Sequence, residues 1–190
     1  MTKRVLLWSA AICAAAFCVY YFGAPGRVMV GGWVDHIGYD TLDEMVQYAD
    51  LIVIGEAPRP IQSYAPIAEL GEDGNPNGIR YTLIDVSVDK VLKGSPASVV
   101  KMSLLAFRTG FKYHKDLWVA DGLSPLQVGK PYLLFLKQGL GGQYYVVGVH
   151  LGKISLDGTD QMEVLMAKAE GDRYLALRLE ALDRYREVLR

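Results

Sequence analysis

The sequence predicts a mainly β protein with some α-helix. A small β-barrel of five to six strands lies between an N-terminal transmembrane helix and C-terminal amphipathic helices. Three observations lead to this fold class. An unbroken apolar run, Val5–Phe22, directly follows Lys3 and Arg4. Short runs rich in β-branched residues then alternate with turn signals, which is typical of a small barrel or sandwich. Residues 159–190 repeat apolar side chains at helical spacing.

The apolar run predicts where the rest of the chain works. At about 18 residues it is just long enough to span a bilayer, and its basic flank stays in the cytoplasm. Residues 1–24 are therefore predicted to be a signal-anchor that holds the protein in the cell membrane through residues 5–22. The protein is then single-pass, with an extracytoplasmic C-terminal domain. The alternative is a signal peptide cut near Ala14–Ala16, which gives a secreted protein.

Composition excludes several classes of function. The 190 residues carry a net charge of −1 without a polybasic block, so nothing supports a nucleic-acid partner. Both cysteines, Cys13 and Cys18, lie in the apolar run. The exported part therefore has no disulfide, no thiol nucleophile and no cysteine-ligated zinc.

After the apolar run, residues 25–40 form a Gly-rich tether. Thr41 and Glu44 have the spacing of a capping box and begin a short helix that ends near Tyr48. The continuous apolar run Leu51–Gly55 then predicts a buried strand.

The next segments are a long loop and the clearest strand. Prolines and glycines through Pro58–Gly78 predict a surface loop. Arg80–Leu92 alternates with period two, which places Thr82, Ile84, Val86 and Val88 on one face. Val91 falls out of this alternation, so a β-bulge is expected near Asp89–Lys90.

Further strands are predicted at Ser98–Phe107, Tyr132–Leu136, Gln143–Val149 and Lys153–Leu156, followed by a tight turn at Asp157–Gly158. Two helices then end the chain, the first capped by Asp160 with Glu163 and the second running from Asp172 to Leu189. Arg178 falls inside the apolar arc of the second helix, so it either snorkels to water or pairs with a carboxylate.

The order of these segments resembles that of small exported bacterial proteins of unassigned function. The segments that carry the resemblance read ADLIVIGEA, YTLIDVSVDKVLKG, LQVGKPYLLFL and YYVVGVHLGKISLDG. More distantly, the order is similar to the OB-type barrel of netrin-like and tissue-inhibitor-of-metalloproteinase domains. The resemblance implies an OB-like β-barrel domain at residues 41–158, with residues 159–190 as a helical segment packed on it. Those inhibitors reach zinc through an N-terminal cysteine held by disulfides, which this exported domain lacks.

Motifs for a cofactor or a metal are not found. The sequence has no Gly-x-Ser-x-Gly, Walker or dinucleotide-binding pattern. The histidines His36, His114 and His150 are too scattered for a metal-ligand motif. We therefore expect no cofactor and no metal.

The best candidate for binding is the segment Phe107–Trp118, which is read as a loop rich in aromatic and basic residues. Exposed aromatic rings beside cations form many binding hot spots, and loops of OB-type barrels bind ligands. The candidate ligand-binding residues are Phe111, Tyr113, His114 and Trp118. The alternative is that Phe111 and Trp118 fold over the barrel mouth as a plug.

The leading prediction is a membrane-anchored extracytoplasmic binding module of unknown ligand, without catalysis, whose partner is a protein or a cell-wall component. Two alternatives stay open. One is a cell-surface hydrolase that uses Asp85 or Asp89 with His114. The other is a structural subunit of a membrane complex that dimerises through the apolar face of Tyr174–Leu189.

Overall fold

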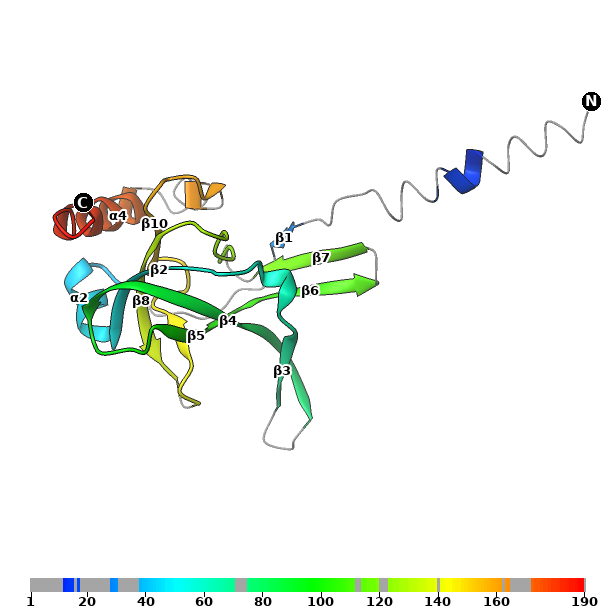
Figure 1. The fold of residues 1–190 in the computed structure, drawn as a ribbon, viewed down its shortest axis with the longest axis horizontal. Coiled ribbons are helices and arrows are strands. Elements are labelled where there is room, and N and C mark those ends of the chain that lie inside the picture. The colour runs from blue at the N-terminus through cyan, green and yellow to red at the C-terminus, as the bar shows by residue number, and fades with distance from the viewer. Residues whose placement is uncertain are drawn as a thin grey trace, which may run out of the picture.

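In the computed structural model, the described residues are 12–15, 17, 28–30, 38–70, 75–111, 114–119, 123–139, 141–161, 163–164 and 172–189. A closed barrel of five strands forms their centre (Figure 1). Its strands are β2 (Leu51–Glu56), β4 (Pro76–Lys93), β5 (Val99–Leu104), β8 (Tyr132–Gln138) and β9 (Tyr144–Val146). They pair in the order β8–β2–β4–β5–β9, and β9 returns to β8 to close the barrel. The pairs are antiparallel except for β5 with β9. The structure confirms the prediction of a mainly β protein built on a small barrel.

Strands β2 and β8 are buried on both faces, which explains their continuous apolar sequences. One face lines the barrel interior, where Leu51 and Val53 meet Leu134. The other face belongs to a second core outside the barrel, which contains Ile52 and Phe135. This outer core is covered by α2 (Leu42–Tyr48) and α4 (Asp172–Arg184).

The predicted cap of α2 is confirmed. The Thr41 hydroxyl accepts from the Glu44 amide at 3.2 Å, and the Glu44 carboxylate accepts from the Thr41 amide. Leu42 and Met45 on the covered face of α2 are fully buried. Local sequence thus begins this helix, and burial of one face holds it on the barrel.

Strand β4 confirms both the alternation and the bulge. Ile84 and Val86 point into the barrel core. Opposite β2, Gly55 pairs with Val88 and Ile54 pairs with Lys90, so Asp89 is the extra residue. A Cβ atom at Gly55 would lie 2.5 Å from the Ser87 carbonyl oxygen, so β2 and β4 approach each other this closely only because Gly55 lacks a side chain.

The prediction of a surface loop at Pro58–Gly78 is wrong in part. This segment contains the short 3-10 helix η2 (Ile61–Ser63) and the strand β3 (Pro66–Leu70), which pairs with the first half of β4. Strands β3 and β4 each begin with a proline, Pro66 and Pro76. Proline lacks an amide hydrogen, but the first position of a strand tolerates it. Residues 71–74 lie outside the described residues.

The predicted loop Phe107–Trp118 is also wrong, because these residues form a β-hairpin. Strand β6 (Ala106–Phe111) pairs antiparallel with β7 (His114–Val119), and the hairpin extends away from the barrel (Figure 1). The single strand predicted at Ser98–Phe107 is divided at Leu105 into β5 and β6. Part of the predicted tether is a strand as well: β1 (Val28–Val30) adds to β7 in parallel.

At the C-terminal end, β10 (Lys153–Ser155) pairs with β8 and is followed by the predicted turn, in which Gly158 has φ +68°. Arg178 of α4 pairs with the Glu163 carboxylate, which is one of its two predicted states. Of the first predicted C-terminal helix, residues 162 and 165–171 lie outside the described residues.

Of the N-terminal region, residues 12–15 and 17 are described, and they are helical. No helix within the described residues is long and apolar enough to cross a membrane. Most of the span predicted at residues 5–22 lies outside the described residues.

Candidate functional site

The candidate ligand-binding residues belong to the β6–β7 hairpin. Phe111 ends β6 and pairs with His114, which begins β7. Trp118 lies four residues further along β7 and is half-buried. Tyr113 lies outside the described residues, as do the side chains of Phe111 and His114.

An aromatic cluster forms at the base of this hairpin. The rings of Phe107 and Trp118, which are paired across the two strands, stack with centroids 6.2 Å apart and an interplanar angle of 11°. The Arg80 guanidinium of β4 lies 5.9 Å from the centre of the Phe107 ring. We name Phe107, Trp118 and Arg80 the aromatic cluster. Because its rings are half-buried, they keep surface for a partner.

The two faces of the hairpin have different roles. Ala106 and Val119, which are paired with each other, are buried in the barrel core, and Leu117 packs against that core. Phe107 and Trp118 fall on the other face because strand residues alternate. The hairpin residues that close the barrel are therefore small or aliphatic, and Trp118 is not part of this core.

The cation Arg108 adds an unusual feature to the hairpin. It is half-buried, and its Nε atom is shielded from water without a hydrogen-bond partner in the described part of the chain. Buried donors are nearly always paired in native proteins. By strand alternation Arg108 lies on the same face of β6 as Ala106, opposite the aromatic cluster, so its shielded Nε atom is not available to a ligand of that cluster.

Asp85, a candidate catalytic residue, is held between two cations. Its carboxylate pairs with Lys101 and, at 2.7 Å, with Arg59, and it also accepts from the Tyr64 hydroxyl. Hydrogen bonds from Lys101 and then from Arg59 hold the pKa of Asp85 below its usual value. Asp85 is thus a stably ionised anion, which makes it a weak proton acceptor near neutral pH.

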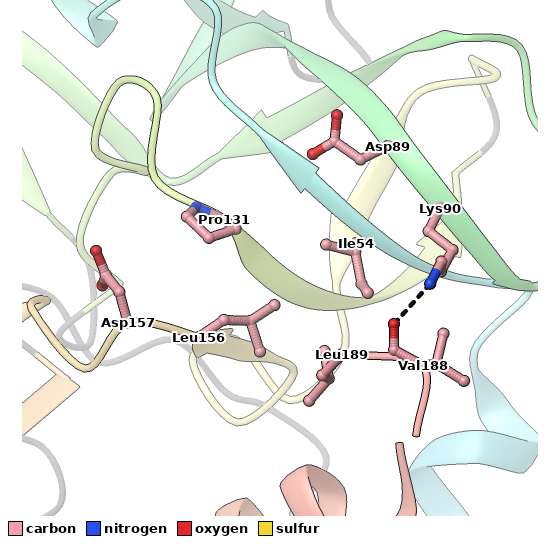
Figure 2. A pocket seen from close by; sticks show the side chains of 8 residues that line it. All are labelled: Ile54, Asp89, Lys90, Pro131, Leu156, Asp157, Val188 and Leu189. Atoms are coloured by element: carbon pink, nitrogen blue, oxygen red, sulfur yellow. Dashed lines mark hydrogen bonds between the residues drawn. The ribbon is translucent and has the colours of Figure 1, made fainter. Parts of the chain in front are cut away.

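Asp89, the second candidate, lines a separate cavity of about 500 Å³ (Figure 2). The cavity lies where the bulge of β4 faces the C-terminal turn of the chain. The residues that line it are Ile54, Asp89, Lys90, Pro131, Leu156, Asp157, Val188 and Leu189. Lys90 closes one side, since its ammonium donates to the Val188 carbonyl at 2.6 Å. Among the described side chains, Asp85 does not line this cavity, so the cavity does not bring the two candidate carboxylates together.

A second cavity, of about 530 Å³, lies beside α2. Its wall includes Tyr39, Tyr48 and Lys137, and the Lys137 ammonium lies 4.8 Å from the centre of the Tyr48 ring. Lys137 also pairs with Asp50 at 2.8 Å. The polar groups here are largely satisfied within the protein, which leaves few of them for a ligand.

A buried polar cluster was not predicted from the sequence. The Lys153 ammonium donates to the Asp160 carboxylate at 2.6 Å, and both side chains are only 3% exposed. Asp160 also accepts from the hydroxyls of Ser124, at 3.0 Å, and Tyr132, at 3.3 Å. Lys153 further donates to both oxygens of Ser124. A lysine within a β-strand was the only signal in the sequence; Asp160 is seven residues from Lys153, whereas Ser124 is 29 residues away.

The pKa values of this buried pair are set by opposing causes. Burial lowers the pKa of Lys153, against the raising effect of the Asp160 carboxylate. Burial alone would raise the pKa of Asp160, but the charge of Lys153 and the hydrogen bonds from Lys153 and Ser124 lower it overall. A serine beside a lysine can act as a nucleophile with its base. Here the Ser124 hydroxyl is committed to Asp160 and is shielded from solvent, so the cluster joins the C-terminal segment to the barrel.

Metal ligands do not gather in the part of the chain that the structure describes: no group of three or more histidine, cysteine, aspartate or glutamate residues there could hold an ion. His150 is buried, with its ring 5.9 Å from that of Tyr174. His36 lies outside the described residues.

Comparisons with known proteins add no relative. The chain matches no model of a known protein family, and no curated protein is significantly similar to it.

Proposed function

We propose that this protein is a membrane-anchored, extracytoplasmic binding module with an OB-like barrel, and that the β6–β7 hairpin is its binding surface. The observation that carries the proposal is the aromatic cluster, in which two stacked rings and a guanidinium lie together on a face that the barrel core does not use. Aromatic rings and arginine are the side chains that most often dominate binding energy.

The arrangement of strands supports the OB-like barrel. Strands β2, β4 and β5 follow one another as an antiparallel meander, and β8 and β9 close the sheet. OB-folds are five-stranded barrels that bind ligands at one face and its adjacent loops. The hairpin is inserted between β5 and β8, where it enlarges the domain beyond the barrel itself.

The length and basic flank of the apolar run Val5–Phe22 support the anchored state, and strand β1 relates that run to the hairpin. This strand follows the apolar run closely in sequence and is paired with β7. If residues 5–22 span the membrane, the hairpin is the part of the domain most directly joined to the anchor. The protein is then a single-pass protein of the cell membrane.

The contacts of the domain do not favour the two alternatives. A hydrolase needs a carboxylate poised to exchange protons, and Asp85 is instead held ionised by Lys101 and Arg59. Dimerisation through α4 needs a broad free apolar face, but Tyr174, Leu177 and Ala181 pack into the outer core of the same chain.

The test is site-specific photo-crosslinking in the full-length protein in its native cell. A crosslinker at position 118 should capture one specific component, which can be a protein, a cell-wall polymer or a lipid. The same crosslinker at Leu179, which is 62% exposed on α4, is the control and should not capture it. Equal capture at the two positions refutes the hairpin as the binding surface, and turnover of a substrate that a point mutation in the domain abolishes refutes a non-catalytic role.

A further inference from the structure

The register of β1 shows which way the N-terminal end of this strand points. Strand β1 runs parallel to β7, with Val28 opposite Leu117 and Val30 opposite Val119. Because β7 runs away from the hairpin turn, Val28 is the residue of β1 nearest to that turn. The N-terminal end of β1 therefore points toward the end of the hairpin at Phe111 and His114.

The number of residues available limits how far the hairpin can lie from the predicted anchor. Five residues separate Phe22 from Val28, and an extended chain of that length spans at most about 20 Å. His114 lies three residues before Leu117 on β7, roughly 10 Å closer to the hairpin turn. Lipid headgroups add about 5–8 Å to each side of the hydrocarbon core. In the anchored protein, the end of the hairpin is therefore within reach of the headgroups.

The chemistry of the hairpin suits a membrane surface. Phe107 and Trp118 stack on the face directed away from the barrel core. Tryptophan, whose apolar ring carries a polar N–H group, concentrates at the boundary between lipid and water.

The charge of the described strands has the sign that anionic headgroups attract. The Arg80 guanidinium lies beside the aromatic face, 5.9 Å from the centre of the Phe107 ring, and the sequence of the two strands has Arg108 and Lys115 against one carboxylate residue, Asp116. Phosphate oxygens are strong acceptors for guanidinium groups, and basic residues close to anionic lipid add to membrane attachment.

We propose that the β6–β7 hairpin lies on the outer surface of the bilayer that holds the anchor, with Phe107 and Trp118 at the level of the lipid headgroups. This inference rests on the anchored state proposed above and names the partner of the same surface. The hairpin is then a second attachment beside the apolar run, and it fixes the orientation of the barrel on the membrane. A single attachment would leave the barrel free to rotate about its tether.

The experiment measures the depth of single tryptophans in the full chain. The protein is reconstituted into vesicles of phosphatidylethanolamine and phosphatidylglycerol, with and without bromine on the acyl chains, since bromine quenches tryptophan fluorescence at short range. The sequence has three tryptophans, so W8F/W33F leaves only Trp118 and W33F/W118F leaves only Trp8. The control carries all three substitutions together with L179W, because α4 lies on the opposite side of the barrel from the hairpin (Figure 1). Circular dichroism checks that each variant is folded.

The expected result is that brominated lipid reduces the emission of Trp8 and of Trp118, and leaves that of the L179W control unchanged. Quenching of Trp8 alone would overturn the membrane contact of the hairpin while leaving the anchor in place. Quenching of neither Trp8 nor Trp118 would overturn both the anchor and the contact. If Trp118 is unquenched and the crosslinker at position 118 captures a protein, the binding surface stands and its assignment to lipid is wrong.

Discussion

Replacing Lys153 with methionine leaves Asp160 as an unpaired carboxylate inside the protein. The two charged atoms are 2.6 Å apart, and each side chain is only 3% exposed. At an effective dielectric constant near 20, their attraction is about 6 kcal/mol, and it is offset by the cost of removing both ions from water. Removal of one partner abolishes the attraction but leaves the other ion buried. We therefore expect K153M to lower the free energy of unfolding by about 3–5 kcal/mol.

The double variant tests the cause of that loss. In K153M/D160N the buried charge is gone, and the amide introduced at position 160 keeps an oxygen that can accept from Ser124 and Tyr132. The free energy of unfolding of the double variant should therefore exceed the value expected from adding the two single losses, by about 2 kcal/mol. Urea unfolding of the full-length protein in detergent micelles, followed by circular dichroism, measures all four members of the cycle.

A surface pair provides the matched control. Lys137 and Asp50 are 2.8 Å apart, but their side chains are 29% and 43% exposed. Because solvent screens this pair, K137M should cost less than about 1 kcal/mol. The reasoning is refuted if K153M costs no more than K137M, or if the losses of K153M and D160N simply add.

Acid titration gives a second readout of the same pair. The pKa of Asp160 is lowered in the folded protein because Lys153 and Ser124 together outweigh its burial. A lowered folded pKa contributes stability above the unfolded value, about 3.9, and that stability is lost as pH falls through the folded pKa. K153M removes the main cause of the lowering, so its stability should fall less between neutral and acidic pH than that of the unmodified protein.

Three further outcomes follow from burial, capping and ionisation. Leu134 is fully buried in the barrel, so L134A should cost about 2–5 kcal/mol in urea unfolding, whereas L179A at a 62% exposed position should stay within about 0.5 kcal/mol. T41A removes the cap of α2 and should cost about 1 kcal/mol; an unchanged free energy would mean that packing alone holds the helix. Burial raises the pKa of Tyr39 to about 12, and a hydrogen bond with Tyr48 raises that of Tyr145 to about 12. A raised pKa in the folded protein contributes stability below the unfolded pKa, about 10, and this stability is lost as pH rises toward 12. The free energy of unfolding should therefore decline between pH 9 and 12, and Y39F should reduce that decline.

The elements predicted correctly are those whose signal is contained in neighbouring residues. The capping box of Thr41 and Glu44 satisfies free amides within one turn of helix. The alternation along β4 and its break near Asp89 encode one buried face and the bulge at Asp89, whereas the second register shift opposite β2, at Leu92, was not predicted. The continuous apolar runs of β2 and β8 predicted burial, and the structure adds that each strand divides its side chains between two cores.

The elements that were missed depend on pairing with distant residues. The hairpin β6–β7 was read as a loop because each of its strands mixes polar and apolar residues without a clear alternation, and Lys112 and Tyr113 are not typical turn residues. Strand β1 has only three residues, and its pairing with β7 identifies it. A strand at the edge of a sheet needs few inward-facing residues, so its sequence carries a weak signal.

The candidate site shows the same division. The sequence identified Trp118, Phe111, Tyr113 and His114 from their composition, and only the pairing of strands shows that Trp118 stacks on Phe107. Arg80 of β4 contacts the Phe107 ring of β6, and no local sequence pattern reveals that these two strands lie close together.

The sequence by itself determined the mainly β class, the buried strands, the cap of α2 and the bulge in β4, because hydrophobic period and capping act between residues a few positions apart. Only the tertiary structure decided that β9 pairs with β5 to close the barrel, that β1 joins the hairpin, and that Lys153 meets Ser124 in the interior. These features come from contacts between segments far apart in the chain. Such contacts depend on how all the segments pack together, so no short stretch of sequence records them.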